Sequence, residues 1–208
     1  MFTGRAYPDG MTRILMMAAA LSLSGLSGAQ SMAGMNHGPD HNMSSMGGMS
    51  MKMDLSGLQK LSGKAFDRAF LSMMIPHHQA AVEMARAVQP LSKDATVKRW
   101  AAAIITAQQG EINQMNAWLG GLGGTDAAMA NMMKSSMSGM GDAVKKAKNP
   151  DVAFVQGMVP HHVSAIDMAT LALQKTSDAR VLKLARDIVR DQATEVHDFR
   201  TWLMKKGL

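Results

Sequence analysis

Apolar residues recur at helical spacing in four stretches of the chain. In the first stretch they are separated by three or four residues, which places them on one face of a helix. That face contains Phe70, Met74, His77, Ala81, Met84 and Val88. The same spacing recurs over residues 97–118, 154–172 and 181–202. The pattern therefore predicts four amphipathic helices.

Residues that cap, bend or break helices set the expected boundaries. Asp67 can cap the start of the first helix. Pro76 removes one backbone hydrogen bond there, so we expect either a kink or a fresh first turn at this position. Residues 90–94 are the expected turn to the second helix, and Gly120 and Gly121 are expected to end that helix.

The chain contains an internal repeat of 84 positions. Residues 67–119 align without a gap with residues 151–203, and 19 of the 53 pairs are identical. Seven of the identical pairs are Met74/Met158, Pro76/Pro160, His77/His161, His78/His162, Gln108/Gln192, Glu111/Glu195 and Trp118/Trp202. Each repeat reads as a helix hairpin, and two hairpins predict an all-α four-helix bundle.

The sequence outside the repeats predicts an exported protein. Residues 1–29 resemble a signal peptide with a short apolar core, and translation could start at Met1 or at Met11. Residues 30–60 are expected to form a disordered Met/His-rich segment. The helical domain is then expected over residues 61–208, with a Met-rich crossover at 120–150. These features place the protein in the periplasm or outside the cell.

Methionine and cysteine usage narrows the chemistry. The 208 residues include 23 methionines and no cysteine, which excludes disulfides and thiolate metal sites. The net charge of +6 is modest, and its Lys and Arg residues are scattered without interleaved aromatics. This distribution argues against nucleic-acid binding. No membrane span is expected once the leader is removed.

The Met/His-rich segment is the first candidate metal site. Thioether and imidazole groups suit Cu(I), and methionine needs no deprotonation to bind. The candidate ligands in this segment are His37, His41, Met43, Met46 and Met49. The alternative is a neutral solubilising tail. A second Met-rich segment at 120–150 is expected to contain at most a short helix over 125–134.

A polar layer inside the bundle is the second candidate site. Gln108 and Glu111 fall in the apolar stripe of the second helix, where a bundle normally places Leu or Ile. Folding the first hairpin about its turn sets His77 and His78 level with them. The second repeat repeats this layer. The candidate ligands are His77, His78, His161, His162, Met74, Met158, Met84, Met168, Glu111 and Glu195.

Consecutive histidines cannot both face the same axis equally, since neighbours on a helix point about 100° apart. His77 and His161 follow the core stripe, and His78 and His162 lie at its flank. Three interpretations stay open: a metal site, a hydrogen-bonded network that only fixes the register, and acid–base catalysis. The last has no evident nucleophile or pocket to support it.

The motif Phe70-x3-Met74-x-Pro76-His77-His78-x2-Ala81-x2-Met84-Ala85, followed by Gln108-x2-Glu111-x6-Trp118-Leu119, resembles the family called domain of unknown function 305. The resemblance covers both repeats. It implies an exported, ferritin-like four-helix bundle, and some relatives with Met/His-rich additions are periplasmic copper-binding proteins. The second copy departs from the first where Val163 replaces Gln79 and Gly157 replaces Met73.

We therefore expect an exported protein that binds copper or silver and sequesters or transfers the ion, and we do not expect an enzyme. The alternative is a structural or interaction module of the cell envelope whose His/Glu network only specifies the fold. Besides the metal ion, a second copy of the chain or a periplasmic metal-transfer protein are the partners that stay open.

Overall fold

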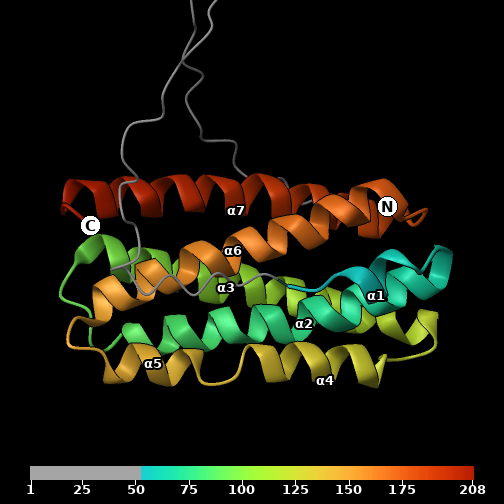
Figure 1. The fold of residues 1–208 in the computed structure, drawn as a ribbon, viewed down its shortest axis with the longest axis horizontal. Coiled ribbons are helices and arrows are strands. Elements are labelled where there is room, and N and C mark those ends of the chain that lie inside the picture. The colour runs from blue at the N-terminus through green and yellow to red at the C-terminus, as the bar shows by residue number, and fades with distance from the viewer. Residues whose placement is uncertain (1–52) are drawn as a thin grey trace, which may run out of the picture. The chain divides into compact units, whose positions relative to one another are not determined.

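The computed structural model describes residues 53–208, and these residues are helical with no strand among them (Figure 1). The all-α prediction is therefore confirmed. The long helices match the two repeats, and two short helices connect them. The elements are α1 (Ser56–Gln59), α2 (Gly63–Val88), α3 (Ala95–Leu119), the 3-10 turn η2 (Gly120–Leu122), α4 (Ala127–Ser136), α5 (Met140–Lys146), α6 (Pro150–Lys175) and α7 (Ala179–Lys205).

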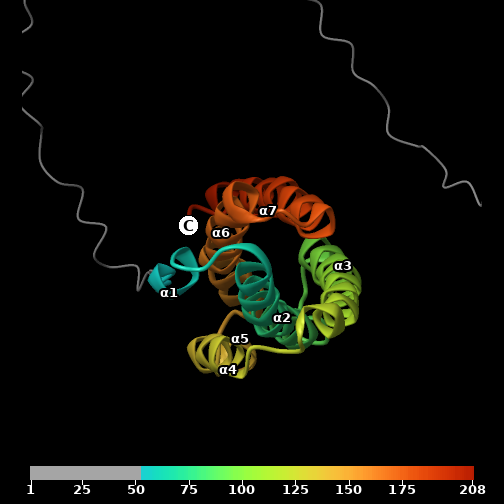
Figure 2. The same cartoon turned by 90° about the vertical axis from the view of Figure 1, so that its right-hand side faces the viewer.

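The four long helices form the bundle as two hairpins. Helix α3 packs against α2 and helix α7 packs against α6, while α2 and α6 join the hairpins by packing against each other (Figure 2). Helices α2 and α6 are antiparallel. The Nζ of Lys175, at the end of α6, donates to the carbonyl oxygens of Gln59 and Leu61, just before α2 begins. The repeats are therefore arranged about an approximate twofold axis between α2 and α6.

The predicted start of the first helix is wrong. Helix α2 begins at Gly63 rather than at Asp67, because Phe66 adds a buried apolar residue to an extra N-terminal turn. Asp67 thus lies inside the helix and is buried. Helix α2 also runs through Pro76 as one element from Gly63 to Val88, so no new helix starts there.

Helix α3 ends at Leu119, directly before Gly120 and Gly121, as predicted. Gly120 keeps a right-handed conformation and opens the 3-10 turn η2. The left-handed residue is Gly123, with a φ of 94° that an L side chain rarely adopts. The chain therefore changes direction at Gly123, after this short turn.

The segment at 120–150 is ordered into α4 and α5, which pack along α2 (Figure 1). Met133 and Met137 are buried in the core there. A Cβ at Gly141 would lie 3.4 Å from the backbone of Glu83, so α5 approaches α2 closely. The expected short helix over 125–134 is present as α4, but the prediction that the rest of this Met-rich segment lacks structure is wrong, because α5 also folds against the apolar outer face of α2. The prediction of disorder over 30–60 is also wrong at its end, where residues 56–59 form α1. Residues 30–52 lie outside the described residues.

A polar layer divides the core into two apolar clusters. One cluster includes Met74 and Met168, and the other includes Met84 and Met158. The four histidines, Gln108 and Gln192 are buried residues that belong to neither cluster. Met74 is equivalent to Met158 in the repeat, and Met84 is equivalent to Met168. Of these four methionines, each apolar cluster therefore contains one from each hairpin.

Candidate metal centre

The four histidines lie in the middle of α2 and α6, as two consecutive pairs that directly follow Pro76 and Pro160. All four are fully buried. The rings of His77 and His161 face each other across the helix pair, with centroids 3.9 Å apart and planes tilted by 38°. The sequence places these two on the core stripe, and the structure brings them together at the twofold axis.

His78 and His162 point sideways to the partner helix of their own hairpin. The Nε2 of His78 lies 2.6 Å from Oε2 of Glu111, and the Nε2 of His162 lies 2.6 Å from Oε2 of Glu195. The register derived for the hairpins predicted these neighbours. The carboxylates sit at the edge of the bundle rather than at its centre, with 21% and 28% of their side chains exposed.

The hydrogen bonds assign the tautomer of each imidazole. Carboxylate oxygens accept only, so His78 and His162 donate through Nε2. His161 donates its Nε2–H to the carbonyl oxygen of His77 at 3.0 Å. Ser164 donates its hydroxyl proton to the carbonyl oxygen of His161, so its Oγ accepts from Nε2 of His77 at 2.8 Å. All four rings thus carry their proton on Nε2.

The other ring nitrogen is the one that can bind an ion. In a neutral imidazole with its proton on Nε2, the Nδ1 atom carries the free lone pair. The Nδ1 atoms of all four histidines are buried and have no hydrogen-bond partner within residues 53–208. A histidine that ligates a metal usually donates its second N–H to a carboxylate or a carbonyl, as three of these four do.

Burial keeps the central imidazoles neutral. The pKa of His77 is held well below its ordinary value by burial, and then by repulsion from the neighbouring imidazoles. The same causes lower the pKa of His161. Both rings therefore keep their lone pairs at neutral pH, and an incoming cation does not compete with a proton.

Amide oxygens and thioethers complete the surroundings. The Oε1 atoms of Gln108 and Gln192 are buried without a hydrogen-bond partner in the described part of the chain. The predicted methionine ligands, Met74, Met158, Met84 and Met168, are all buried in the clusters on either side of the polar layer. In residues 53–208 no three His, Asp or Glu side chains gather as a metal-binding group. The buried candidate ligands in these residues are imidazole and thioether groups, types that suit soft ions.

The sequence patterns did not identify two neighbours of the histidines, Ser164 and Phe199. Ser164 orients His77, but its counterpart in the first repeat is Ala80, so the repeat gave no signal for it. Phe199 packs against the His162 ring at 5.5 Å between centroids. Its counterpart is Met115, a buried thioether. The two halves of the layer therefore differ in chemistry.

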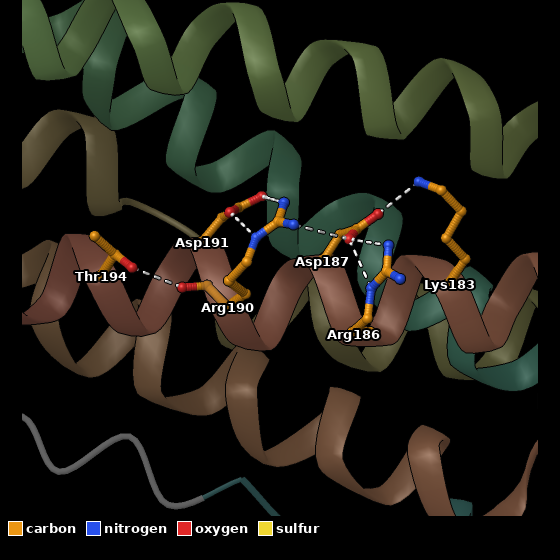
Figure 3. Close-up of polar contacts among 6 residues, drawn as sticks. All are labelled: Lys183, Arg186, Asp187, Arg190, Asp191 and Thr194. Carbon is orange, nitrogen blue, oxygen red and sulfur yellow. Dashed lines mark hydrogen bonds and ion pairs between the residues drawn. The ribbon is translucent and has the colours of Figure 1, made fainter. Parts of the chain in front are cut away.

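A charged groove between α3 and α7 reaches the rim of the layer. It has a volume of about 330 Å³ and is lined by Glu111, Trp118, Lys183, Asp187, Arg190 and Asp191, among others. On α7 its wall is a row of ion pairs, with Lys183 and Arg186 on Asp187 and Arg190 on Asp191 (Figure 3). These opposite charges, one to four residues apart, were visible in the sequence, but their position opposite Glu111 was not.

The remaining predicted ligands lie outside the described residues: His37, His41, Met43, Met46 and Met49. No helix in residues 53–208 has the length and apolar character needed to span a membrane.

Solved structures with the same fold include metal complexes. The protein CopM in its Cu(II)-bound form is 32% identical, with a TM-score of 0.61, over 67% of this chain and 96% of CopM. CopM has also been solved with Cu(I) and with Ag bound, at 30% identity and a TM-score of 0.57. A protein from Streptomyces coelicolor described as secreted is 24% identical, with a TM-score of 0.60, over 68% of this chain and 93% of its own, and shows the fold alone.

Sequence comparison gives one short match and one family. An uncharacterized protein, L153 of Acanthamoeba polyphaga mimivirus, is 43% identical over 53 residues. The match spans 26% of this chain and 35% of that relative. Residues 11–119 and 151–208 match the family described as a domain of unknown function, DUF305. The chain therefore belongs to the DUF305 family.

Proposed function

We propose that the protein is an exported binding protein that holds monovalent copper, or silver, in its buried histidine layer and sequesters or transfers the ion. The observation that carries the proposal is the set of four unprotonated Nδ1 atoms, each on a ring fixed by its Nε2–H. The complexes of CopM with Cu(I) and Ag support the same class of ion.

The chemistry of the layer favours a soft, singly charged ion. Neutral imidazoles and thioethers bring no negative charge into the core, so a divalent ion there would be poorly compensated. Glu111 and Glu195 stay at the rim, where each fixes an imidazole rather than adding charge to the centre. Enclosure on all sides also keeps solvent away from the bound ion.

The Met/His-rich segment at 30–53 has a separate part in this proposal. Its thioethers and its imidazoles, His37 and His41, would collect ions outside the cytoplasm and pass them to the buried layer. Export is supported by the leader-like residues 1–29.

The test is an anaerobic Cu(I) titration against a competing chelator, using the chain from residue 30 onward. We expect His77→Leu with His161→Leu to weaken binding at the core by at least about 100-fold, since two neutral ligands are lost. The matched control is His197→Gln, which changes an exposed histidine of α7 and should leave the affinity unchanged. Circular dichroism verifies that the helices persist.

Deleting residues 30–53 separates the two parts of the proposal. Without this segment the core site should keep its affinity while the number of ions bound falls. Unchanged Cu(I) binding in the His77/His161 double variant would overturn the core site, and negligible binding by every version would overturn the copper function.

A second candidate follows from the same hydrogen bonds. Each histidine already has a partner for Nε2, so the layer could serve only to fix the register of the bundle. In that case the Leu double variant gains stability and metal binding does not change, because replacing a buried polar pair with apolar groups is often stabilising.

A further inference from the structure

The outer face of α6 is apolar and no described segment covers its centre. We define this face as Val159, Pro160, Val163 and Ile166; Val163 is 43% exposed and the other three are half-buried. The 26 residues of α6 include only three charges, Asp151, Asp167 and Lys175. A helix that is apolar almost all round is normally enclosed on every side.

The repeat shows what a covered version of this face looks like. The equivalent residues of α2 are Ile75, Pro76, Gln79 and Val82, 84 positions earlier. Three of these four are buried, and only Gln79 is exposed. The cover is the Met-rich segment of α4 and α5, which packs along α2 (Figure 1). The outer face of α2 is thus covered by a Met-rich segment, whereas no described segment covers the equivalent face of α6.

The start of the described chain lies beside the open face. Met53 and Leu55 pack partly buried against the core. Together with Gln59 of α1 they form a hollow with Asp167 and Leu171 of α6. Figure 2 shows α1 beside α6. The described chain therefore begins next to Asp167, one residue from Ile166.

The preceding seven residues have the length and composition to cover the face. Residues 46–52 contain Met46, Met49 and Met51 and end in Lys52. An extended chain of seven residues spans about 23 Å. From Asp167 to Val159 along α6 is about 12 Å. Lys52 also has the sign of charge that complements Asp167.

We propose that residues 46–52 lie across the outer face of α6 and cover it as α4 and α5 cover α2. Unbranched methionine side chains adapt to an irregular apolar surface, as Met133 and Met137 do against α2. The segment thereby brings three thioethers onto the helix that carries His161 and His162. The proposal does not depend on copper binding, and it holds in the metal-free protein.

The lack of native cysteine makes the test direct, because two introduced cysteines can be cross-linked selectively. The chain from residue 30 onward carries Met49→Cys with Val163→Cys, and a short bismaleimide is added without metal. We expect a cross-link within one chain to form at least tenfold faster than in the matched control, Met49→Cys with Gln79→Cys. Both Val163 and Gln79 are exposed, so neither change should disturb folding.

Two outcomes overturn the proposal. Equal rates for the two pairs mean that residues 46–52 have no preferred face. Products linked between two chains at Val163, with little linking inside one chain, mean that a second copy covers α6. A further check uses Val159→Cys with Met49→Cys in a Val163→Asp background, where a buried charge should slow the linking several-fold.

Discussion

At the scale of single residues, the paired histidines have different roles that their adjacency in sequence conceals. His77 and His161 meet at the axis between the hairpins, while His78 and His162 anchor to carboxylates of the same hairpin. The common outcome is one tautomer for all four rings. Each imidazole could in principle carry its proton on either ring nitrogen. Acceptors on three helices (Glu111, Ser164 and Glu195) and the backbone carbonyl of His77 place it on Nε2 in all four rings.

The depressed pKa values of His77 and His161 predict acid sensitivity in the metal-free protein. Above about pH 6.5 both rings are neutral whether the chain is folded or unfolded, so they add no pH dependence. Below this pH the two imidazoles become protonated in the unfolded chain but stay neutral in the folded chain, because burial holds both folded pKa values low. The free energy of unfolding should therefore fall by up to about 1.4 kcal/mol per pH unit for each ring.

Urea unfolding at pH 7.5, 6.0 and 5.0 measures this effect. The His77→Leu, His161→Leu double variant should lose most of the pH dependence, whereas His197→Gln should keep it. A flat stability profile across this range for the unsubstituted protein contradicts the prediction.

The contact between Glu111 and His78 leads to a second prediction, which concerns metal affinity. Glu111→Gln keeps an oxygen that can accept from Nε2 of His78 but removes the charge that fixes the ring. Since groups that orient a ligand typically contribute 10- to 100-fold to metal affinity, we expect Cu(I) binding to weaken by about that factor. The control is Glu83→Gln, an exposed carboxylate of α2, and equal affinities for the two variants would count against the role of Glu111.

At the scale of elements, equivalent helices of the two repeats carry different residues where they pack against different neighbours. Gly157 of α6 replaces Met73 of α2, and a Cβ at Gly157 would lie 2.8 Å from Cε of Met84. The missing side chain gives Met84 of the opposite hairpin its space. Met73 is fully buried on α2.

The packing of α4 predicts that two adjacent methionines contribute very differently to the free energy of unfolding. Met133 is 1% exposed against the core, and Met132 is 45% exposed. We expect Met133→Ala to cost about 2–5 kcal/mol of unfolding free energy, because it leaves a cavity. Met132→Ala should change stability by less than about 0.5 kcal/mol. Chemical denaturation of both variants compares them, and similar small losses would mean that α4 does not support the core.

At the scale of the whole molecule, polar contacts at the ends of the bundle join the two repeats. Asp94 caps α3 by accepting from the backbone N–H of Thr96 and Val97. Its other oxygen accepts from Nε1 of Trp202 in α7 at 3.1 Å. Asp151 of α6 similarly accepts from the backbone N–H of Lys93. The turn of the first hairpin is therefore held by two residues of the second hairpin.

Asp94 and its repeat counterpart Asp178 allow this connection to be measured. Asp178 caps α7 and pairs with the exposed Arg180, which lowers the pKa of that carboxyl to about 2. Asp178→Ala should cost about 1 kcal/mol for the lost cap. Asp94→Ala also leaves the Trp202 N–H without its acceptor, so we expect about 2–3 kcal/mol. Thermal unfolding of both variants tests the difference, and equal losses would exclude the link between hairpins.

Sequence patterns predicted much of this arrangement. Helical spacing located the four long helices, and the fold of each hairpin set His78 beside Glu111 and His162 beside Glu195. These inferences held because both depend on local geometry, which the helix repeat and the turn position define. The short helix over 125–134 was predicted and corresponds to α4, but α5 was missed because the Gly-, Ser- and Met-rich sequence around it has little periodicity and its helix depends on the apolar face of α2.

The sequence by itself determined that two like hairpins would bring imidazoles, amides and acids to one level, since an 84-residue repeat imposes the same geometry twice. Only the tertiary structure decided which atoms face one another. The antiparallel crossing of α2 and α6 placed His77 against His161 and supplied Ser164 as an acceptor. Ring orientation and tautomer depend on partners distant in sequence, so no local pattern could specify the four free Nδ1 atoms on which the proposed metal site rests.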